Sequence, residues 1–468
     1  MYEDICFADA VELAQRIRTK ALSPVEVVKA HLERIEAINP KINAVVTITD
    51  GVLEKAKAAE AAVMSGETLG LLHGVPFTCK DMFDVAGVRT TRGSKLFEHR
   101  VATADATVVA RLKQAGGIFL AKTNVPEFAL WWETDNMVFG RTNNPWNLER
   151  TTGGSSGGEA AAIVTGLSPL GIGSDVGGSI RMPAHYCGIV GLKPTHGRVP
   201  LTGHWPKVLL RAMHVGPMAR TVRDVALALK LMSGPDGIDP YAMPVPLPDV
   251  PGSEAALPKL RIGWSAERGF DLVEPEVQKV VEKAAASLAS LGCKVEPVPL
   301  DILVQNDAQL ISSPIWAMES GFYFEPFVSG REAELFPFMR KRLANPLPEM
   351  RDYLKAMADW ETLKHGMAEY FRQYDLLLCP TVPLAAYPHA LPELTINGKT
   401  VMPRRKLITL VPWNLTGSPA ISVPLGQSSE GLPIGVQIVG RHFEEDTVLE
   451  AAMALENLTD VRQRHPEL

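Results

Sequence analysis

Hydrophobic positions recur along most of the chain at a spacing typical of helices or of short buried strands. Residues 23–39 follow the helical spacing behind a capping box, in which Ser23 caps, Pro24 takes the first helical position and Glu26 reaches back. A second helix is expected to end at Gly66. The pattern predicts helices over residues 52–65, 105–114, 159–166, 221–233, 275–291 and 446–458.

Short apolar runs bounded by turn residues lie between these helices. The pattern predicts strands within residues 71–80, 117–123, 259–264, 294–300, 375–383, 420–426 and 431–440. Strands that alternate with helices indicate an α/β fold with a large mixed, mostly parallel sheet. The proline-rich residues 235–258 are expected to form a long surface connection, and the glycine-rich residues 171–184 a loop.

Composition narrows the class of protein. The 468 residues are 46% hydrophobic and 21% charged, which is enough apolar material for a large core. The net charge is −6 without a basic block, which argues against a nucleic-acid partner. Five scattered cysteines show no metal-binding spacing, so we expect no metal site and a reduced compartment. No signal-peptide pattern or membrane-length apolar run is found, so we expect a cytoplasmic protein without a membrane span.

The stretch "TTGGSSGGEAAAI" (residues 151–163) combines glycines and serines and then becomes alanine-rich. A flexible linker would join separate units, whereas this stretch leads directly into a helical pattern. A phosphate-binding loop needs Gly-Lys-Ser/Thr, which the stretch lacks. The pattern G-x-S-x-G matches around both Ser155 and Ser156, but a nucleophile elbow should follow a buried strand, and the preceding residues are polar.

A second glycine-rich stretch suggests a different site. Ser179 follows Gly177 and Gly178, and two glycines before a serine let successive backbone N–H groups point the same way and hold an oxyanion. Lys80 stands at the end of an apolar strand, where burial would depress its pKa toward neutrality, as a general base requires. Taken singly, each of these residues is more often structural; their joint occurrence suggests catalysis.

Together these pieces resemble the amidase signature family. The resemblance extends over "GVPFTCKDMFDVAGVRTTRGS", "TGGSSGGEAAAI", "GIGSDVGGSIRMPAHYCGIVGLKPTHGRVP" and "WNLTGSPAISVPLG", and only residues 235–370 lack it. It implies one compact α/β/α domain for residues 1–468, with a core signature region at about 74–220. The variable region at about 301–370 would cover the active site. No metal or organic cofactor is implied.

The resemblance also implies a Ser–cis-Ser–Lys triad. Carried over by position, Ser179 is the nucleophile, Ser155 is the bridging serine after a cis peptide bond from Gly154, and Lys80 is the base. The implied oxyanion hole consists of the backbone N–H groups of Val176, Gly177, Gly178 and Ser179. The implied supporting residues are Gly154 and Ser156 in the first loop and the pair Asp175 and Arg181, which we interpret as an ion pair or backbone clamp.

The implied reaction is hydrolysis of an amide C–N bond through a Ser179 acyl-enzyme, with a small-molecule amide as the partner and with esters or carbamates as further substrates. The alternative is the glutamine-hydrolysing amidase subunit of a tRNA-dependent amidotransferase. That subunit typically continues after "GRVP" with text resembling "ASSLDQ", whereas this chain reads "LLRAMHVGP". Glu159 in "GGSSGGE" is similar to the fatty acid amide hydrolase branch. The resemblance is compatible with a homodimer.

Aromatic side chains suggest an apolar substrate. Leu130 and Trp131 stand where family members border the substrate pocket. Residues 316–338 contain seven aromatics, more than the 7% average predicts: Trp316, Phe322, Tyr323, Phe324, Phe327, Phe336 and Phe338. They would form the core of a small cap, the lining of a substrate channel, or a patch that contacts a second copy or a membrane.

Overall fold

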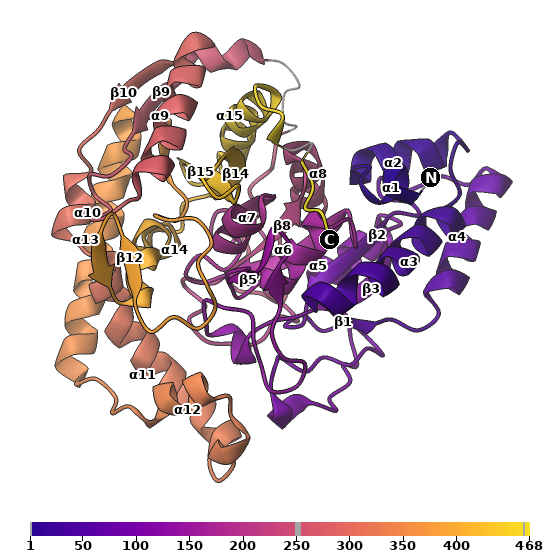
Figure 1. Cartoon of the computed structure of the whole chain (residues 1–468), viewed down its shortest axis with the longest axis horizontal. Helices are drawn as coiled ribbons and strands as arrows, with labels where there is room; N and C mark the ends of the chain where they lie inside the picture. The colour runs from indigo at the N-terminus through magenta and orange to yellow at the C-terminus, as the bar shows by residue number, and fades with distance from the viewer. Residues whose placement is uncertain (1, 249–253, 462–463) are drawn as a thin grey trace.

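A computed structural model describes residues 2–248, 254–461 and 464–468 of the chain. Its centre is one sheet of eleven strands, and two further two-stranded ribbons lie outside it. The sheet runs across the molecule from β1, near the N-terminal helices, to β10 on the opposite side (Figure 1). The strands in spatial order are β1 (Val45–Ile48), β3 (Ile118–Thr123), β2 (Pro76–Lys80), β6 (Leu170–Asp175), β8 (His214–Ala219), β7 (Val190–Lys193), β14 (Ala420–Gln427), β15 (Pro433–Gly440), β11 (Leu376–Pro380), β9 (Arg261–Trp264) and β10 (Lys294–Pro297).

The sheet is mixed, as the sequence predicts. Parallel neighbours lie toward its two ends, where β3, β2 and β6 form one group and β11, β9 and β10 form another. Antiparallel pairs join β6, β8, β7, β14, β15 and β11 in the middle, and β1 is antiparallel to β3 at the edge. The α/β class inferred from alternating strands and helices is therefore confirmed.

Helices cover both faces of the sheet. One face packs against α5 (Thr107–Gln114), α8 (Val222–Met232), α9 (Pro275–Ser290) and α15 (Glu445–Asn457) in the largest apolar cluster. The other face carries α6 (Gly157–Val164) and α7 (Arg181–Cys187). The N-terminal helices are α1 (Tyr2–Cys6), α2 (Ala10–Arg18), α3 (Pro24–Ile42) and α4 (Val52–Ser65). None of the helices in the described residues is long and apolar enough to span a lipid bilayer.

Several predicted helix ends are confirmed. The helix α3 begins with the expected capping box, because Ser23 accepts from the first turn and Glu26 accepts from the Ser23 amide. Gly66 ends α4 in a left-handed conformation. The helix predicted to begin near residue 221 is also present as α8, and the Thr221 side chain caps it. These signals are local, so the sequence alone was enough to place them.

The loop predicted for residues 171–184 is largely wrong. Residues 170–175 form the buried strand β6, α7 begins at Arg181, and only the five residues between them are irregular. The glycines of β6 serve close packing instead of a turn: a Cβ on Gly173 would lie 2.8 Å from the sulfur of Met218. Glycine in a strand was therefore misread as a loop signal.

The segment predicted to cover the active site is helical and projects from the sheet (Figure 1). It comprises α10 (Asp301–Gln305), α11 (Ala308–Val328), α12 (Pro337–Ala344) and α13 (Met350–Gln373), and α11 and α13 pack on α14 (Val411–Thr416). We call α11 and α12 the cap. Of the expected connection at 235–258, residues 235–248 are irregular, residues 249–253 lie outside the described chain, and Glu254–Lys259 form a 3-10 turn.

Candidate active site

Lys80 occupies the last position of β2, and the alternation of the strand decides where it points. Phe77 and Cys79 join the apolar cluster beneath one face of the sheet, so Thr78 and Lys80 face the other side, toward α6. The Lys80 side chain is fully buried. Its Nζ lies 2.6 Å from the Ser155 Oγ, and it also contacts the Oγ of Ser174 at 3.0 Å.

Burial changes the proton affinity of this lysine. Removing the ammonium from water lowers the pKa of Lys80 to about 7, although the carboxylates of Asp175 and Glu159 act in the opposite direction. Near neutral pH a substantial fraction of Lys80 is therefore unprotonated. An unprotonated amine within hydrogen-bond distance of a serine hydroxyl can accept its proton.

The bridging position is built by the turn before α6. The peptide bond between Gly154 and Ser155 is cis, as the family resemblance implied. Two glycines near this bond have no room for a side chain. A Cβ on Gly154 would lie 2.9 Å from the Trp131 carbonyl oxygen, and a Cβ on Gly158 would lie 2.5 Å from the Asn124 amide nitrogen. The crowding of glycines in this stretch therefore lets α6 start directly against its neighbours.

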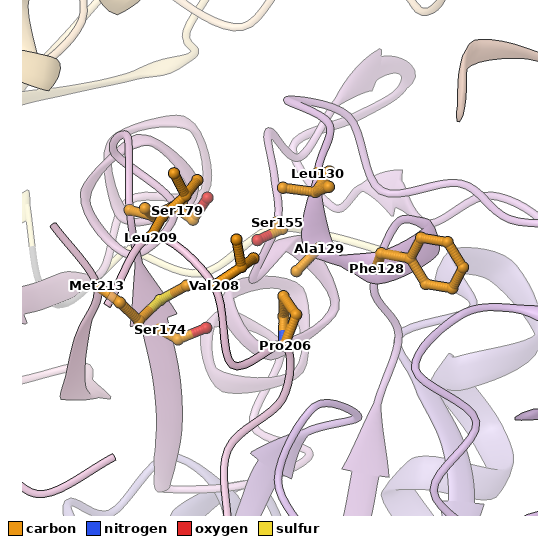
Figure 2. A pocket seen from close by; sticks show the side chains of 11 residues that line it. Phe128, Ala129, Leu130, Ser155, Ser174, Ser179, Pro206, Val208, Leu209 and Met213 are labelled. Atoms are coloured by element: carbon orange, nitrogen blue, oxygen red, sulfur yellow. The ribbon is translucent and has the colours of Figure 1, made fainter. Parts of the chain in front are cut away.

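Ser179 lies in the short loop between β6 and α7, opposite Ser155. Both serines and Ser174 line one narrow cavity (Figure 2). The backbone carbonyl of Ser179 accepts a hydrogen bond from the Ser156 amide at 3.2 Å, which joins the two glycine-rich stretches. The described residues form no hydrogen bond between the Ser155 and Ser179 hydroxyls. The step of the expected relay from Ser179 to Ser155 is therefore not hydrogen-bonded in this structure.

Asp175 organises the loop that carries Ser179. Its carboxylate accepts hydrogen bonds from the amides of Gly178, at 2.7 Å, and Ile180, at 3.1 Å. The Gly178 amide, which is expected to belong to the oxyanion hole, thus donates to Asp175 in this structure. Within the described chain, the amides of Val176, Gly177 and Ser179 have no protein acceptor. These three remain available to an oxyanion.

The expected pairing of Asp175 with Arg181 is present, and both side chains are fully buried. Burial opposes ionisation of Asp175, but Arg181 and the amide of Asn414 hold the pKa of this carboxyl well below its usual range. Arg181 also donates to the side chains of Asn414 and Gln437. The pair therefore clamps the Ser179 loop to α14 and to β15 in one charge-compensated network.

The walls of the cavity are mostly apolar, and the cavity is narrow, with a volume of about 10 Å³. Leu130 is among the lining residues, whereas Trp131 is not and packs against Phe336 and Phe338. The side chains that line the cavity beside the serines come from three segments: Phe128, Ala129 and Leu130; Val176; and Pro206, Val208, Leu209 and Met213.

The aromatic stretch 316–338 packs mainly within the cap and against the wall of the cavity. Phe324 is buried and stacks on Phe128 with a ring separation of 4.8 Å. The hydroxyl of Tyr323 accepts a hydrogen bond from the Lys207 amide, beside the cavity wall. None of the seven aromatics is a lining residue of this cavity. The arrangement fits the first of the three interpretations, the core of a cap, and only Phe322 is more than half exposed, at 59%.

Comparison with known proteins assigns the chain to a family. The family model described as Amidase matches residues 26–449. The chain belongs to the amidase signature family. It is 37% identical to an acylamidase of Rhodococcus erythropolis, over 99% of this chain and 98% of that protein. It is also 37% identical to a glutamyl-tRNA(Gln) amidotransferase subunit from Moorella thermoacetica, over 99% of both chains. A solved bacterial aryl acylamidase superposes with a TM-score of 0.88 at 30% identity, covering 98% of this chain and 99% of that one.

Two further observations concern other residue types near the candidate site. No group of three or more His, Cys, Asp or Glu side chains suited to a metal ion is present within the described ranges. Cys187 lies near the site in sequence, but its side chain is buried, and burial raises the pKa of its thiol far above neutrality. A thiolate nucleophile is therefore disfavoured at this position.

Sequence reasoning missed Ser174 and several wall residues of the candidate site. Ser174 contacts Lys80 through both its hydroxyl and its carbonyl oxygen. Leu209 and Met213 supply part of the cavity wall from a segment more than 25 residues after Ser179. A strand assignment for residues 170–175 would have revealed Ser174, since it would have placed that side chain beside β2; the wall residues carry no comparable local signal.

Proposed function

We propose that the chain is a stand-alone amidase that cleaves the C–N bond of amides through an acyl-enzyme on Ser179. The observation that carries the proposal is the position of Lys80: a fully buried lysine, with its pKa lowered to about 7, contacts Ser155 in the same cavity that Ser179 lines. A buried lysine without a carboxylate in direct contact is costly for stability, and such groups concentrate at functional sites.

The geometry supports a relay of protons. Neutral Lys80 accepts a proton from Ser155 as Ser155 accepts one from Ser179, and the Ser179 Oγ attacks the carbonyl carbon. The amides of Val176, Gly177 and Ser179 face the developing oxyanion. The C–N bond then breaks as the proton returns to the leaving nitrogen. A water molecule, deprotonated through the same relay, attacks the acyl-enzyme and releases the carboxylic acid and free Ser179.

The cavity favours an apolar acyl or leaving group. Its walls carry leucine, valine, proline, methionine and phenylalanine side chains, and its polar side chains are those of the three serines. Each methylene group that a substrate transfers from water to such walls contributes about 0.8 kcal/mol, or roughly fourfold in kcat/KM. We therefore expect aryl and medium-chain acyl amides to be better substrates than acetamide, with aryl esters and carbamates as additional substrates.

The second candidate function is glutamine hydrolysis as part of an amidotransferase, which the identity to the Moorella protein supports. Against it, residues 209–217 differ from the sequence that is typical of the amidotransferase subunit, and this segment contributes Leu209 and Met213 to the cavity wall. Apolar walls of this kind offer no hydrogen-bonding group for the charged end of glutamine. The stand-alone hydrolase is therefore the better-supported interpretation of the site.

The two candidates are separated by assaying the purified single chain on 4-nitroacetanilide, hexanamide, acetamide and glutamine, with Ser179→Ala as the control. Turnover of the anilide and of hexanamide, with little activity on glutamine, supports the stand-alone amidase. Preference for glutamine, or activity that depends on an added partner protein, contradicts it and favours the amidotransferase function.

A further inference from the structure

A second acidic side chain lies behind the lysine, at a position that the proposed mechanism does not use. Glu159 stands in the first turn of α6, four residues after Ser155, and is fully buried. One carboxylate oxygen accepts a hydrogen bond from the Thr78 hydroxyl, and the other accepts from the Thr123 hydroxyl at 2.8 Å. No cation forms an ion pair with Glu159 within the described residues.

The sheet register places this carboxyl group on the same face as Lys80. In the parallel pairing of β2 with β3, Thr123 lies beside Lys80, and Thr78 precedes Lys80 by two positions on the same face of β2. Gly171 of β6 is paired with Thr78, and a Cβ at Gly171 would overlap the carboxylate of Glu159. Three strands and a helix thus form a space shaped for this one acidic group.

Three titratable groups face the lysine, and a fourth faces Glu159. Glu159 faces it from α6, Asp175 from β6, and His204 from the turn that pairs with Phe83; Lys122 of β3 faces Glu159 in turn. Burial lowers the pKa of His204 to about 3, so this ring is uncharged near neutrality.

The two carboxylates near Lys80 differ in how their charge is compensated. The Asp175 carboxylate forms an ion pair with Arg181 and accepts from several amides. Among the described residues, Glu159 is held only by the hydroxyl groups of Thr78 and Thr123. Burial raises the pKa of Glu159 to about 7, with Lys80 and Lys122 among the groups that lower it. When Glu159 is ionised, its charge acts on Lys80 across a low-dielectric interior with little compensation from a direct partner.

We propose that Glu159 is a positioning residue that acts through Lys80: its carboxylate stabilises the ammonium that forms when the lysine accepts the relay proton. The proposal rests on the proposed role of Lys80 as the base. Because Glu159 does not line the cavity, its removal should affect proton transfer without affecting substrate binding.

The principal test is Glu159→Gln, which keeps the size of the side chain and one acceptor oxygen. Without the negative charge, the ammonium form of Lys80 is less favourable, so the acidic limb of kcat/KM should move to lower pH by roughly one unit. The plateau value of kcat should fall several-fold because the ammonium is also less stabilised in the transition state, and KM should stay unchanged. The pH dependence of Ser179 inactivation by a fluorophosphonate should show the same shift, which gives a readout that does not depend on amide turnover.

Two further variants make the test decisive. Thr123→Val leaves the carboxyl group in place but removes a hydrogen bond that favours its ionised form, so the limb should move in the same direction by a smaller amount. Asp224→Asn is the matched control, because Asp224 is a buried carboxyl group that accepts hydrogen bonds from the amides of Ala10 and Val11. The acidic limb of kcat/KM in this variant should coincide with that of the unmodified chain. Thermal unfolding establishes that each variant is folded.

The proposal is overturned if the acidic limb of kcat/KM in folded Glu159→Gln stays in place or moves to higher pH. If that variant does not fold, an unchanged limb in Thr123→Val overturns it. Lys80→Met separates this failure from a failure of the proposed function. Loss of turnover in Lys80→Met together with an unmoved limb in Glu159→Gln refutes only the role of Glu159, whereas a Lys80→Met variant that remains active refutes the lysine base itself.

Discussion

The indole ring of Trp316 lies against Gly177: a Cβ added to Gly177 would be 2.7 Å from the Cη2 atom of the ring. Gly177 belongs to the loop that carries Ser179, and Trp316 belongs to the cap helix α11. The cap therefore reaches the loop directly, and the absence of a side chain at position 177 is what allows this contact.

This contact predicts that Gly177→Ala lowers activity because the added methyl group collides with the cap. The loss does not come from the backbone amide, since alanine keeps the N–H. The added methyl group should displace either the loop or Trp316 and lower kcat by roughly tenfold to a hundredfold. Trp316→Ala should partly restore the rate when combined with Gly177→Ala. A double-mutant cycle on kcat checks this, and purely additive losses would show that the two residues act independently.

The lowered pKa of Lys80 sets the pH dependence of the reaction. The active form of the base is the neutral amine, and the folded protein protonates it as the pH falls through about 7. We therefore expect kcat/KM to be highest above this value and to fall about tenfold per pH unit below it. Profiles between pH 5 and 9 on an anilide, with chemistry shown to be rate-limiting, test the expectation; a flat profile would argue against a lysine base.

The buried pair of Asp175 and Arg181 is predicted to stabilise the fold as well as the loop. Asp175→Asn leaves the Arg181 charge without its partner, so we expect a loss of about 3–5 kcal/mol in the free energy of unfolding together with a large loss of activity. Denaturant unfolding measures the stability. Asp84→Asn, which breaks the partly exposed pair with Arg100, is the matched control and should cost at most about 1 kcal/mol. Equal effects in the two variants would contradict the interpretation.

The cavity wall predicts substrate preference. Leu209→Ala removes apolar surface from the wall, so kcat/KM should fall more for hexanamide than for acetamide. Leu310→Ala serves as the control, because Leu310 is on the cap helix but is 73% exposed. A series of acyl amides of increasing length measures the effect. If acetamide remains the best substrate of the series in the unmodified chain, the apolar-wall argument is wrong.

Local signals explain which parts of the structure the sequence could predict. The capping box at Ser23, the glycine end at Gly66 and the apolar strand ending at Lys80 each depend on neighbouring residues, and the structure contains all three. The strand β6 was missed because Gly171 and Gly173 serve contacts with Glu159 and Met218, which are distant in sequence. A residue chosen for a long-range contact gives no reliable local signal.

The same distinction applies to the candidate site. Family motifs were sufficient to single out Lys80 and Ser155, whose side chains the structure brings to 2.6 Å. They could not show that Asp175 occupies the Gly178 amide, because the direction of an N–H group depends on the loop conformation. The packing of Trp131 on Phe336 and Phe338 gave no local signal either, since these two residues lie about 200 residues further along the chain.

The central claim, that Ser179 is the nucleophile, is tested most directly by covalent labelling. A fluorophosphonate probe incubated with the folded chain should form one adduct, and mass-spectrometric mapping should place it on Ser179, whose hydroxyl lines the cavity beside the free amides. Ser179→Ala should remain folded, be unlabelled and be inactive. An adduct mapped to Ser155, Ser156 or Cys187, or full labelling and turnover in Ser179→Ala, would contradict the account.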